Sequence, residues 1–348
     1  MLMTALAASA AAGPLDEMSL DRWAKLREVE RYQMQMADRF YKQQNWKAAL
    51  AEYEKYITLY EKSDGASYAQ LKWGLSQVQL RKANTAVKDG FQTVLDYWPD
   101  SPDAAKARYH IGRTWMDMGR LDQAKKAYQA MLADSPLGKK PDDDVDRLRH
   151  LAAAHALDDL AEIAGIEKDD RARAECWKKL TFDVDRGEAT ATLCRQAAKN
   201  YTQWCFAQEA FEEGVRALAT SYPPATLPSR VATYVGPAVA HLARDEQTRA
   251  KAQRLADQAA AWLRKQGPQD NQPKEKEAKE ALRHLLQSVA DLHAAAAQER
   301  QVGEVYEEII RRCGVSDATL TRLAGWHESR DRFDEACKVY RRFEDKAE

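Results

Sequence analysis

The feature that most constrains this chain is a fixed spacing of small, aromatic and proline residues. In residues 107–136 the spaced positions are Gly112, Trp115, Gly119, Ala124, Tyr128 and Pro136. Small side chains let two antiparallel helices approach closely, aromatic side chains fill the space around them, and glycine readily takes the positive φ of a turn. The spacing therefore predicts packing between two short helices, and it does not require a chemical reaction.

The same spacing recurs along the chain. Two upstream units begin near residues 35 and 71. Gly74 and Gly112 are 38 residues apart, whereas Phe91 and Tyr128 are 37 apart, so the second unit carries one extra residue. Toward the C-terminus the period is 34 residues, and it pairs Leu286 with Leu320, Val289 with Leu323, Ala290 with Ala324, His293 with His327, Val302 with Ala336, Tyr306 with Tyr340, and Ile309 with Phe343. Such periods are typical of stacked repeats.

The composition agrees with a helical chain. Good helix formers dominate, and alternating runs of β-branched residues are nearly absent. The net charge of −1 and the mixed signs of the charged residues, 31% of the chain, argue against nucleic acid or an anionic membrane as the partner. No apolar run after the N-terminus approaches the roughly 20 residues of a transmembrane helix.

These units resemble tetratricopeptide repeats. Residues 30–138 and 281–346 follow the pattern of that family, which in the third unit reads Arg108, Ile111, Gly112, Trp115, Ala124, Tyr128 and Pro136. The resemblance implies an all-α fold, a right-handed superhelical solenoid of antiparallel helix pairs. The connection at 97–112, YWPDSPDAAKARYHIG, resembles bacterial envelope members of the outer-membrane assembly lipoprotein and Tol–Pal coordinator type, which are non-catalytic adaptors.

The pattern divides the chain into five segments. We predict a leader or disordered tail at 1–18, an N-terminal repeat array at 19–140, degenerate helical repeats at 141–266, a linker at 267–280 and a C-terminal repeat pair at 281–348. The apolar start MLMTALAASAAAGP is similar to a secretory signal but has no basic residues before it. It is either a truncated signal or an alanine-rich tail, so a periplasmic or otherwise exported location is expected, with the cytoplasm as the alternative.

No segment carries a recognisable catalytic or cofactor motif. His150 and His155 are five residues apart, which places them on different helix faces. The acidic run 142–146 after Pro141 is typical of a helix start. We predict no catalytic residues, no metal and no cofactor. The five cysteines form no CxxC pair and are either buried thiols or include a Cys194–Cys205 or Cys313–Cys337 bridge.

A repeat array of this kind leaves a concave face lined by the first helix of each pair. The positions beside the small residues are predicted to form a partner-binding groove: Met34, Asp38, Tyr41, Tyr68, Leu71, Leu75, Val78, Lys106, Tyr109, Arg113 and Met116. This mixed apolar and aromatic set with few charges favours an amphipathic helix or an extended peptide as ligand. The alternative is that the leader or the chain's own middle segment covers the groove.

The predicted function is a non-catalytic scaffold or adaptor that binds a protein segment in this groove, within a bacterial envelope complex. Two alternatives stay open. One is a hydrolase or carbohydrate-active subunit with a site in residues 142–270, where the repeats are degenerate and Trp204 has no assigned packing role. The other is a structural solenoid that associates only with itself.

Overall fold

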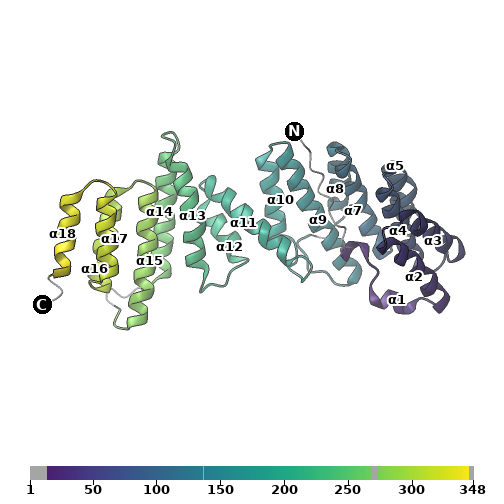
Figure 1. The fold of residues 1–348 in the computed structure, drawn as a ribbon, viewed down its shortest axis with the longest axis horizontal. Coiled ribbons are helices and arrows are strands. Elements are labelled where there is room, and N and C mark those ends of the chain that lie inside the picture. The colour runs from purple at the N-terminus through teal and green to yellow at the C-terminus, as the bar shows by residue number, and fades with distance from the viewer. Residues whose placement is uncertain (1–13, 136, 269–272, 345–348) are drawn as a thin grey trace. The chain divides into compact units, whose positions relative to one another are not determined.

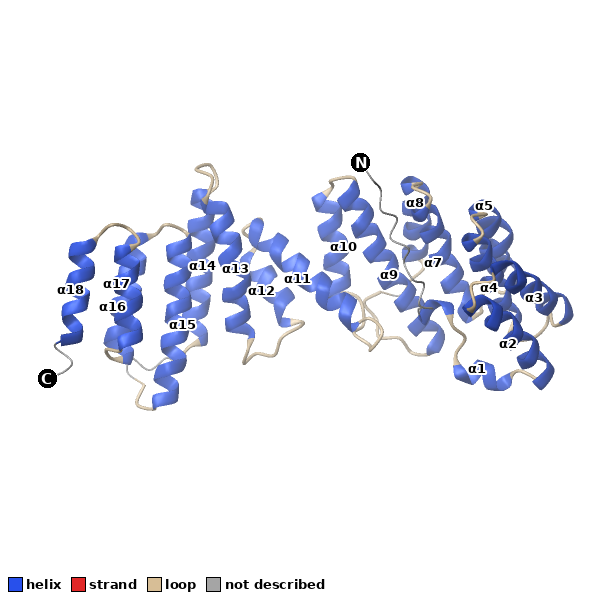
Figure 2. Ribbon diagram, in the orientation of Figure 1, coloured by secondary structure: helices blue, strands red, loops and turns tan. Residues whose placement is uncertain are grey.

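The computed structural model describes residues 14–135, 137–268 and 273–344, and these residues form helices and connecting turns without a strand (Figure 2). The predicted all-α fold is confirmed. The chain forms two compact units, one ending at Ala197 and the other beginning at Ala198. This boundary lies inside the segment 141–266, which the sequence treats as one region.

The first unit is a row of helical hairpins preceded by a short N-terminal segment (Figure 1). That segment contains the 3-10 turn η1 (Pro14–Asp16) and helix α1 (Leu20–Lys25). The hairpins are α2 (Glu28–Lys42) with α3 (Trp46–Leu59), α4 (Ala66–Gln79) with α5 (Ala83–Thr85), η2 (Ala86–Phe91) and α6 (Gln92–Tyr97), α7 (Pro102–Asp117) with α8 (Leu121–Ala133), and α9 (Asp144–Ile166) with α10 (Asp170–Phe182).

The second unit continues the hairpin arrangement around one apolar core, which extends from Phe206 to Val339. Its helices are α11 (Ala191–Ala207, which crosses the boundary), α12 (Phe211–Ala219), α13 (Leu227–Ala243), α14 (Arg249–Gln266), α15 (Lys276–Ala295), α16 (Glu299–Cys313), α17 (Asp317–Glu328) and α18 (Phe333–Glu344). Helix α15 begins at Lys276, inside the segment predicted to be a linker. Pro237 lies inside α13.

The spacing that the sequence analysis singled out acts in the α7–α8 hairpin as predicted. A Cβ on Gly112 would lie 2.3 Å from the ring of Tyr128, so only glycine permits this close contact. Ala124 and Tyr128 are fully buried. Gly119 has a φ of +71° in the turn between the helices, a conformation in which side chains are strained. The packing explanation for these residues is confirmed.

The extra residue of the second repeat, which lies in the first compact unit, has a structural counterpart. The glycine and the aromatic residue that meet in a hairpin are 17 positions apart in Gly74 and Phe91 (91 − 74), but 16 apart in Gly112 and Tyr128 (128 − 112). Residues 86–91 form a π-helical turn, η2, which accommodates one residue more than an α-helical turn. A Cβ on Gly74 would still lie 2.7 Å from Phe91, so the same contact forms in both hairpins.

The 34-residue repeat of the second unit also corresponds to packing positions. Leu286, Val289 and Ala290 are buried, as are their equivalents Leu320, Leu323 and Ala324. Tyr306 is buried, whereas its equivalent Tyr340 is 42% exposed. Helix α17 follows and contacts the helix that bears Tyr306, and no later helix of the described residues packs on α18 in the same way.

Several single-residue expectations can also be checked. Asp143 caps the start of α9, where its carboxylate accepts a hydrogen bond from the backbone N–H of Asp146 at 2.8 Å, as expected for the acidic run. All five cysteines are free thiols: Cys194, Cys205 and Cys313 are buried, Cys176 is half-buried and Cys337 is exposed. The two disulfide bridges considered from the sequence are therefore not formed.

Candidate functional site

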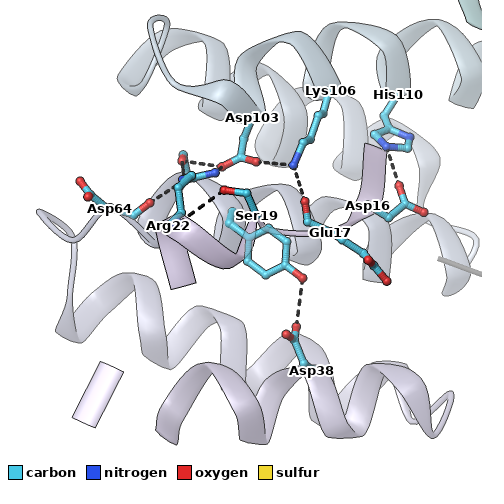
Figure 3. Close-up of polar contacts among 11 residues, drawn as sticks. Asp16, Glu17, Ser19, Arg22, Asp38, Asp64, Asp103, Lys106 and His110 are labelled. Carbon is cyan, nitrogen blue, oxygen red and sulfur yellow. Dashed lines mark hydrogen bonds and ion pairs between the residues drawn. The ribbon is translucent and has the colours of Figure 1, made fainter. Parts of the chain in front are cut away.

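The face formed by helices α4 and α7 of the first unit is covered by residues 14–26, which we call the N-terminal segment (Figure 3). Its first residues belong to the leader or disordered tail predicted at 1–18. Residues 14–18 instead lie against the helices, in agreement with the alternative that the leader covers the groove; residues 1–13 lie outside the described residues. The face therefore already holds a piece of polypeptide.

The second half of the segment is held by buried charges. Arg22 on α1 makes an ion pair of 2.8 Å with Asp103 on α7, and its guanidinium also donates to the carbonyl of Asp64 at 2.6 Å. Lys106, one turn along α7, lies 3.0 Å from the other oxygen of Asp103. Asp103 is fully buried, and burial alone would raise its pKa. The two cations overcome that effect and hold the pKa below its usual range.

The first half of the segment makes three different contacts, two of them with α7 and one with an apolar cluster of α7, α8 and α9. The Lys106 ammonium donates a hydrogen bond of 2.6 Å to the backbone carbonyl of Glu17. His110 Nε2 lies 2.9 Å from a carboxylate oxygen of Asp16. Leu15 is 4% exposed and belongs to an apolar cluster with Met116 of α7 and Leu151 of α9. The helix face thus offers a contact for main chain, one for a carboxylate and one for an aliphatic side chain.

A cavity of about 580 Å³ lies between the N-terminal segment, α2 and α4. Its walls include Trp23, Tyr41 and Tyr68, together with the buried Lys72. The Lys72 ammonium lies 3.5 Å from the centre of the Tyr41 ring, a cation–π contact. Burial lowers the pKa of Lys72 to about 8. This size and mixture of polar and apolar groups suit a bound side chain or small ligand.

Asp38 forms a second polar part of the cavity wall. The hydroxyl of Tyr53 donates a hydrogen bond of 2.5 Å to this carboxylate, and that of Tyr68 lies at 3.4 Å. Burial raises the pKa of Asp38 above its usual value. The cavity therefore contains a fixed acceptor and a separate cation.

A second polar group joins α7, α8 and α9. Arg113 makes ion pairs with Asp159 at 3.0 Å and with Asp117 at 3.1 Å, and the Tyr128 hydroxyl donates to Asp159 at 2.5 Å. Burial raises the pKa of Tyr128, and the negative charge of Asp159 raises it further. Each member of this group has a partner within the protein, so its geometry supports positioning of the three helices.

The predicted groove residues divide into two classes. The buried ones are Met34, Tyr68, Leu71, Leu75, Lys106 and Met116, and the half-buried ones are Asp38, Tyr41, Val78, Tyr109 and Arg113. Met34, Leu71 and Leu75 lie in apolar clusters between helices, away from the surface. Asp38, Tyr41 and Tyr68 line the cavity, and Lys106 contacts the N-terminal segment. Whether these residues bind a partner stays a prediction.

Sequence reasoning missed three residues of this face: Lys72, Asp103 and His110. It expected few charges there, and the structure differs because these groups and Lys106 all lie on α4 and α7. A signal was present in the sequence. Asp103 and Lys106 are one turn apart among alanines at the start of a helix, and Lys72 stands within the apolar run LKWGL.

No group of three or more His, Cys, Asp and Glu side chains is arranged to hold a metal ion within residues 14–135, 137–268 and 273–344. Over the same residues, none of the helices combines the length and the apolar character needed to cross a bilayer.

Comparison with known proteins identifies one part of the chain by sequence. Residues 106–137 match the family model of the tetratricopeptide repeat, which confirms the repeat predicted at 107–136. No curated protein matches the chain.

Three solved helical-repeat structures that match the chain are distant from it in sequence. The C-terminal part of a TPR repeat-containing protein from Cytophaga hutchinsonii has 13% identity and a TM-score of 0.36, covering 84% of this chain and 98% of that one. The TPR2AB domain of yeast Sti1, in a complex with pHSP90, has 15% identity and a TM-score of 0.31, covering 81% and 98%. The P58(IPK) TPR domain has 13% identity and a TM-score of 0.26, covering 90% and 92%.

Proposed function

We propose that this chain is a non-catalytic protein-interaction scaffold whose first unit binds a peptide segment on the face formed by α4 and α7. The observation that carries the proposal is that this face already holds a peptide, residues 14–17, through main-chain and side-chain contacts. The tetratricopeptide repeat at 106–137 supplies α7, the helix that makes most of those contacts. A face with separate contacts for backbone, carboxylate and aliphatic groups is suited to recognising polypeptide.

A photo-crosslinking experiment tests this proposal. A crosslinking amino acid is placed at Gln35, an exposed residue on the cavity wall, and in a matched variant at Tyr32, which lies on the same helix, is 66% exposed and does not line the cavity. We expect a specific protein adduct from position 35 and none from position 32. Equal labelling from both positions, or from neither, would reject the α4–α7 face as the binding surface.

The cellular location forms a finer part of the proposal. We propose that the scaffold works in a bacterial envelope complex, supported by the apolar start of the sequence and by the resemblance of the connection at 97–112 to envelope adaptors. Fractionation of native cells with an antibody against the chain tests the location. Recovery in the periplasmic or membrane fraction is expected, and recovery with cytosolic markers would contradict the proposal.

A further inference from the structure

We propose that residues 14–18 are a replaceable internal ligand, and that the partner of this face is a short segment in which an aliphatic residue is followed directly by an aspartate or glutamate. The inference rests on the proposed function, because it names the partner chemistry of the same face. Residues 14–18, which we call the tip, leave the face when the partner segment binds.

The contacts of the N-terminal segment fall into a firm half and a weak half. In the firm half, Arg22 is paired with the fully buried Asp103 and donates to the carbonyl of Asp64, and Leu26 is 3% exposed. Among residues 15–18 of the tip, Leu15 is buried, Asp16 and Met18 are half-buried and Glu17 is exposed. A segment with so few buried groups opens far more readily than one fixed by a buried ion pair.

Opening of the tip exposes a preformed binding site. Lys106 stays beside Asp103, which holds its ammonium in place to donate to a carbonyl oxygen. His110 is stacked on Phe91 with ring centres 5.6 Å apart, so its orientation does not depend on Asp16. The pocket of Leu15 is formed by residues of α7, α8 and α9, which are packed together by their own core. None of the three contacts has to be built by the incoming segment.

The geometry of the tip defines the chemistry of the partner. The aliphatic side chain fills the pocket of Leu15, and the carboxylate of the next residue takes the place of Asp16 beside His110. The carbonyl of the third residue accepts the hydrogen bond from Lys106. The hydrogen bond to the carbonyl is the same for every residue type, so the third position can be any residue. The first two contacts depend on the side chain and require an aliphatic residue followed by an acidic one.

A segment of a different protein is favoured, as the occupant of this face, over the tip of a second copy of this chain. The tip is tethered to α1, which Arg22 fixes to its own unit. Five extended residues reach about 17 Å at most. Exchange of tips would therefore require the α1 of one copy to come within that distance of the α7 of another. A segment from a different protein has no such restriction.

The test measures binding of a fluorescein-labelled peptide of sequence PLDEMSL, the sequence of residues 14–20, to the full chain by fluorescence anisotropy. The protein variant Leu15→Ser with Asp16→Asn releases the tip but keeps Arg22 and Leu26. When a site is open for only a fraction of the time, the apparent Kd of a peptide is its intrinsic Kd divided by that fraction. We expect the variant to bind at least about tenfold more tightly than the unchanged chain.

Control peptides separate specific recognition from general adhesion. Replacing the aspartate of the peptide with asparagine, or its leucine with alanine, should each weaken binding by about tenfold, as expected for loss of one well-formed contact. A His110→Gln change in the tip-released protein should abolish the preference for aspartate over asparagine while leaving the effect of the leucine. Circular dichroism checks that each variant is folded.

Three results would overturn the inference. The first is equal affinity of the unchanged and tip-released proteins for the peptide. The second is equal binding of the aspartate and asparagine peptides. The third is a dimer, seen by light scattering of the unchanged protein, that is absent in the Leu15→Ser, Asp16→Asn variant. If crosslinking from position 35 still captures a partner while the peptide fails to bind, the proposed function stands and this inference alone is wrong.

Discussion

The two units bury different kinds of side chain. Among its described residues, the first unit buries five side chains of charged residues: Glu30, Lys72, Asp103, Lys106 and Asp159. The buried polar residues described in the second unit are all uncharged or histidine: Thr202, Gln287, His293, Gln298 and Thr319. Burying a charge opposes folding unless the charge is paired, so charges tend to persist where they hold another group in place. In the first unit, three of the five lie against the N-terminal segment or the cavity beside it.

The largest predicted difference between the units comes from removal of a buried carboxylate. Asp103→Asn leaves the nearby Arg22 and Lys106 without their anion, and we expect a loss of about 3–5 kcal/mol in the free energy of unfolding. Asp291→Asn in the second unit breaks an exposed ion pair with Arg322 and should cost less than about 1 kcal/mol. Urea unfolding measures both changes. Similar losses would remove the distinction between the units.

The pH dependence of the Asp103 effect follows from the direction of its pKa shift. The pKa is lower in the folded protein than in the unfolded chain, so the carboxylate stabilises the fold fully above the unfolded value. That contribution disappears as the pH falls through the folded value. The difference in stability between the unchanged protein and Asp103→Asn should therefore shrink in acid, and a constant difference would contradict the assignment.

The next largest effect is a gain in stability from Lys72→Met. Burial lowers the pKa of Lys72 from 10.5 to about 8, so below pH 8 the folded protein carries a charge that opposes folding by roughly 3 kcal/mol. The methionine variant should be more stable by up to about that amount at pH 7. Between pH 8 and 10.5, Lys72 is protonated in the unfolded chain but neutral in the folded protein. The stability difference between the methionine variant and the unchanged protein should therefore decline over that range. Thermal unfolding at several pH values measures it.

The smallest effects compare two glycines inside helices. Gly112→Ala places a methyl group against the ring of Tyr128 and should destabilise the protein by about 1–3 kcal/mol. Gly303→Ala, on α16 of the second unit, meets no atom within 4 Å and should stabilise it by about 0.5–1 kcal/mol through helix propensity. Opposite signs in thermal unfolding are expected. A destabilising Gly303→Ala would show that the spacing of small residues does not explain where glycine is required.

Much of the fold could be predicted because its main contacts are local in sequence. Gly112 and Tyr128 meet within one hairpin, so their spacing carries the information. The residue spacing showed that the second repeat has one residue more than the third. The sequence did not indicate that a π-helical turn would accommodate this residue.

The candidate site could be predicted less well because its contacts join distant residues. Leu15 shares a cluster with Leu151, and Lys106 bonds to Glu17, and no periodic pattern connects such pairs. Residues 1–18 were assigned to a leader or disordered tail, and the alternative that the leader covers the groove named no contact for residues 14–18. The buried Lys72 contradicts the expectation that charged residues lie outside, and only the three-dimensional arrangement of Tyr41 and the cavity explains its position.

Hydrogen–deuterium exchange with mass spectrometry tests the central claim, that the α4–α7 face is a peptide site held by its own tip, most directly. The unchanged protein is measured with and without excess PLDEMSL peptide. We predict that the peptide makes the amides of residues 15–18 exchange faster, because the tip is displaced, while those of residues 20–25 keep their protection. Unaltered protection of residues 15–18 at a peptide concentration that saturates the tip-released variant would contradict the claim.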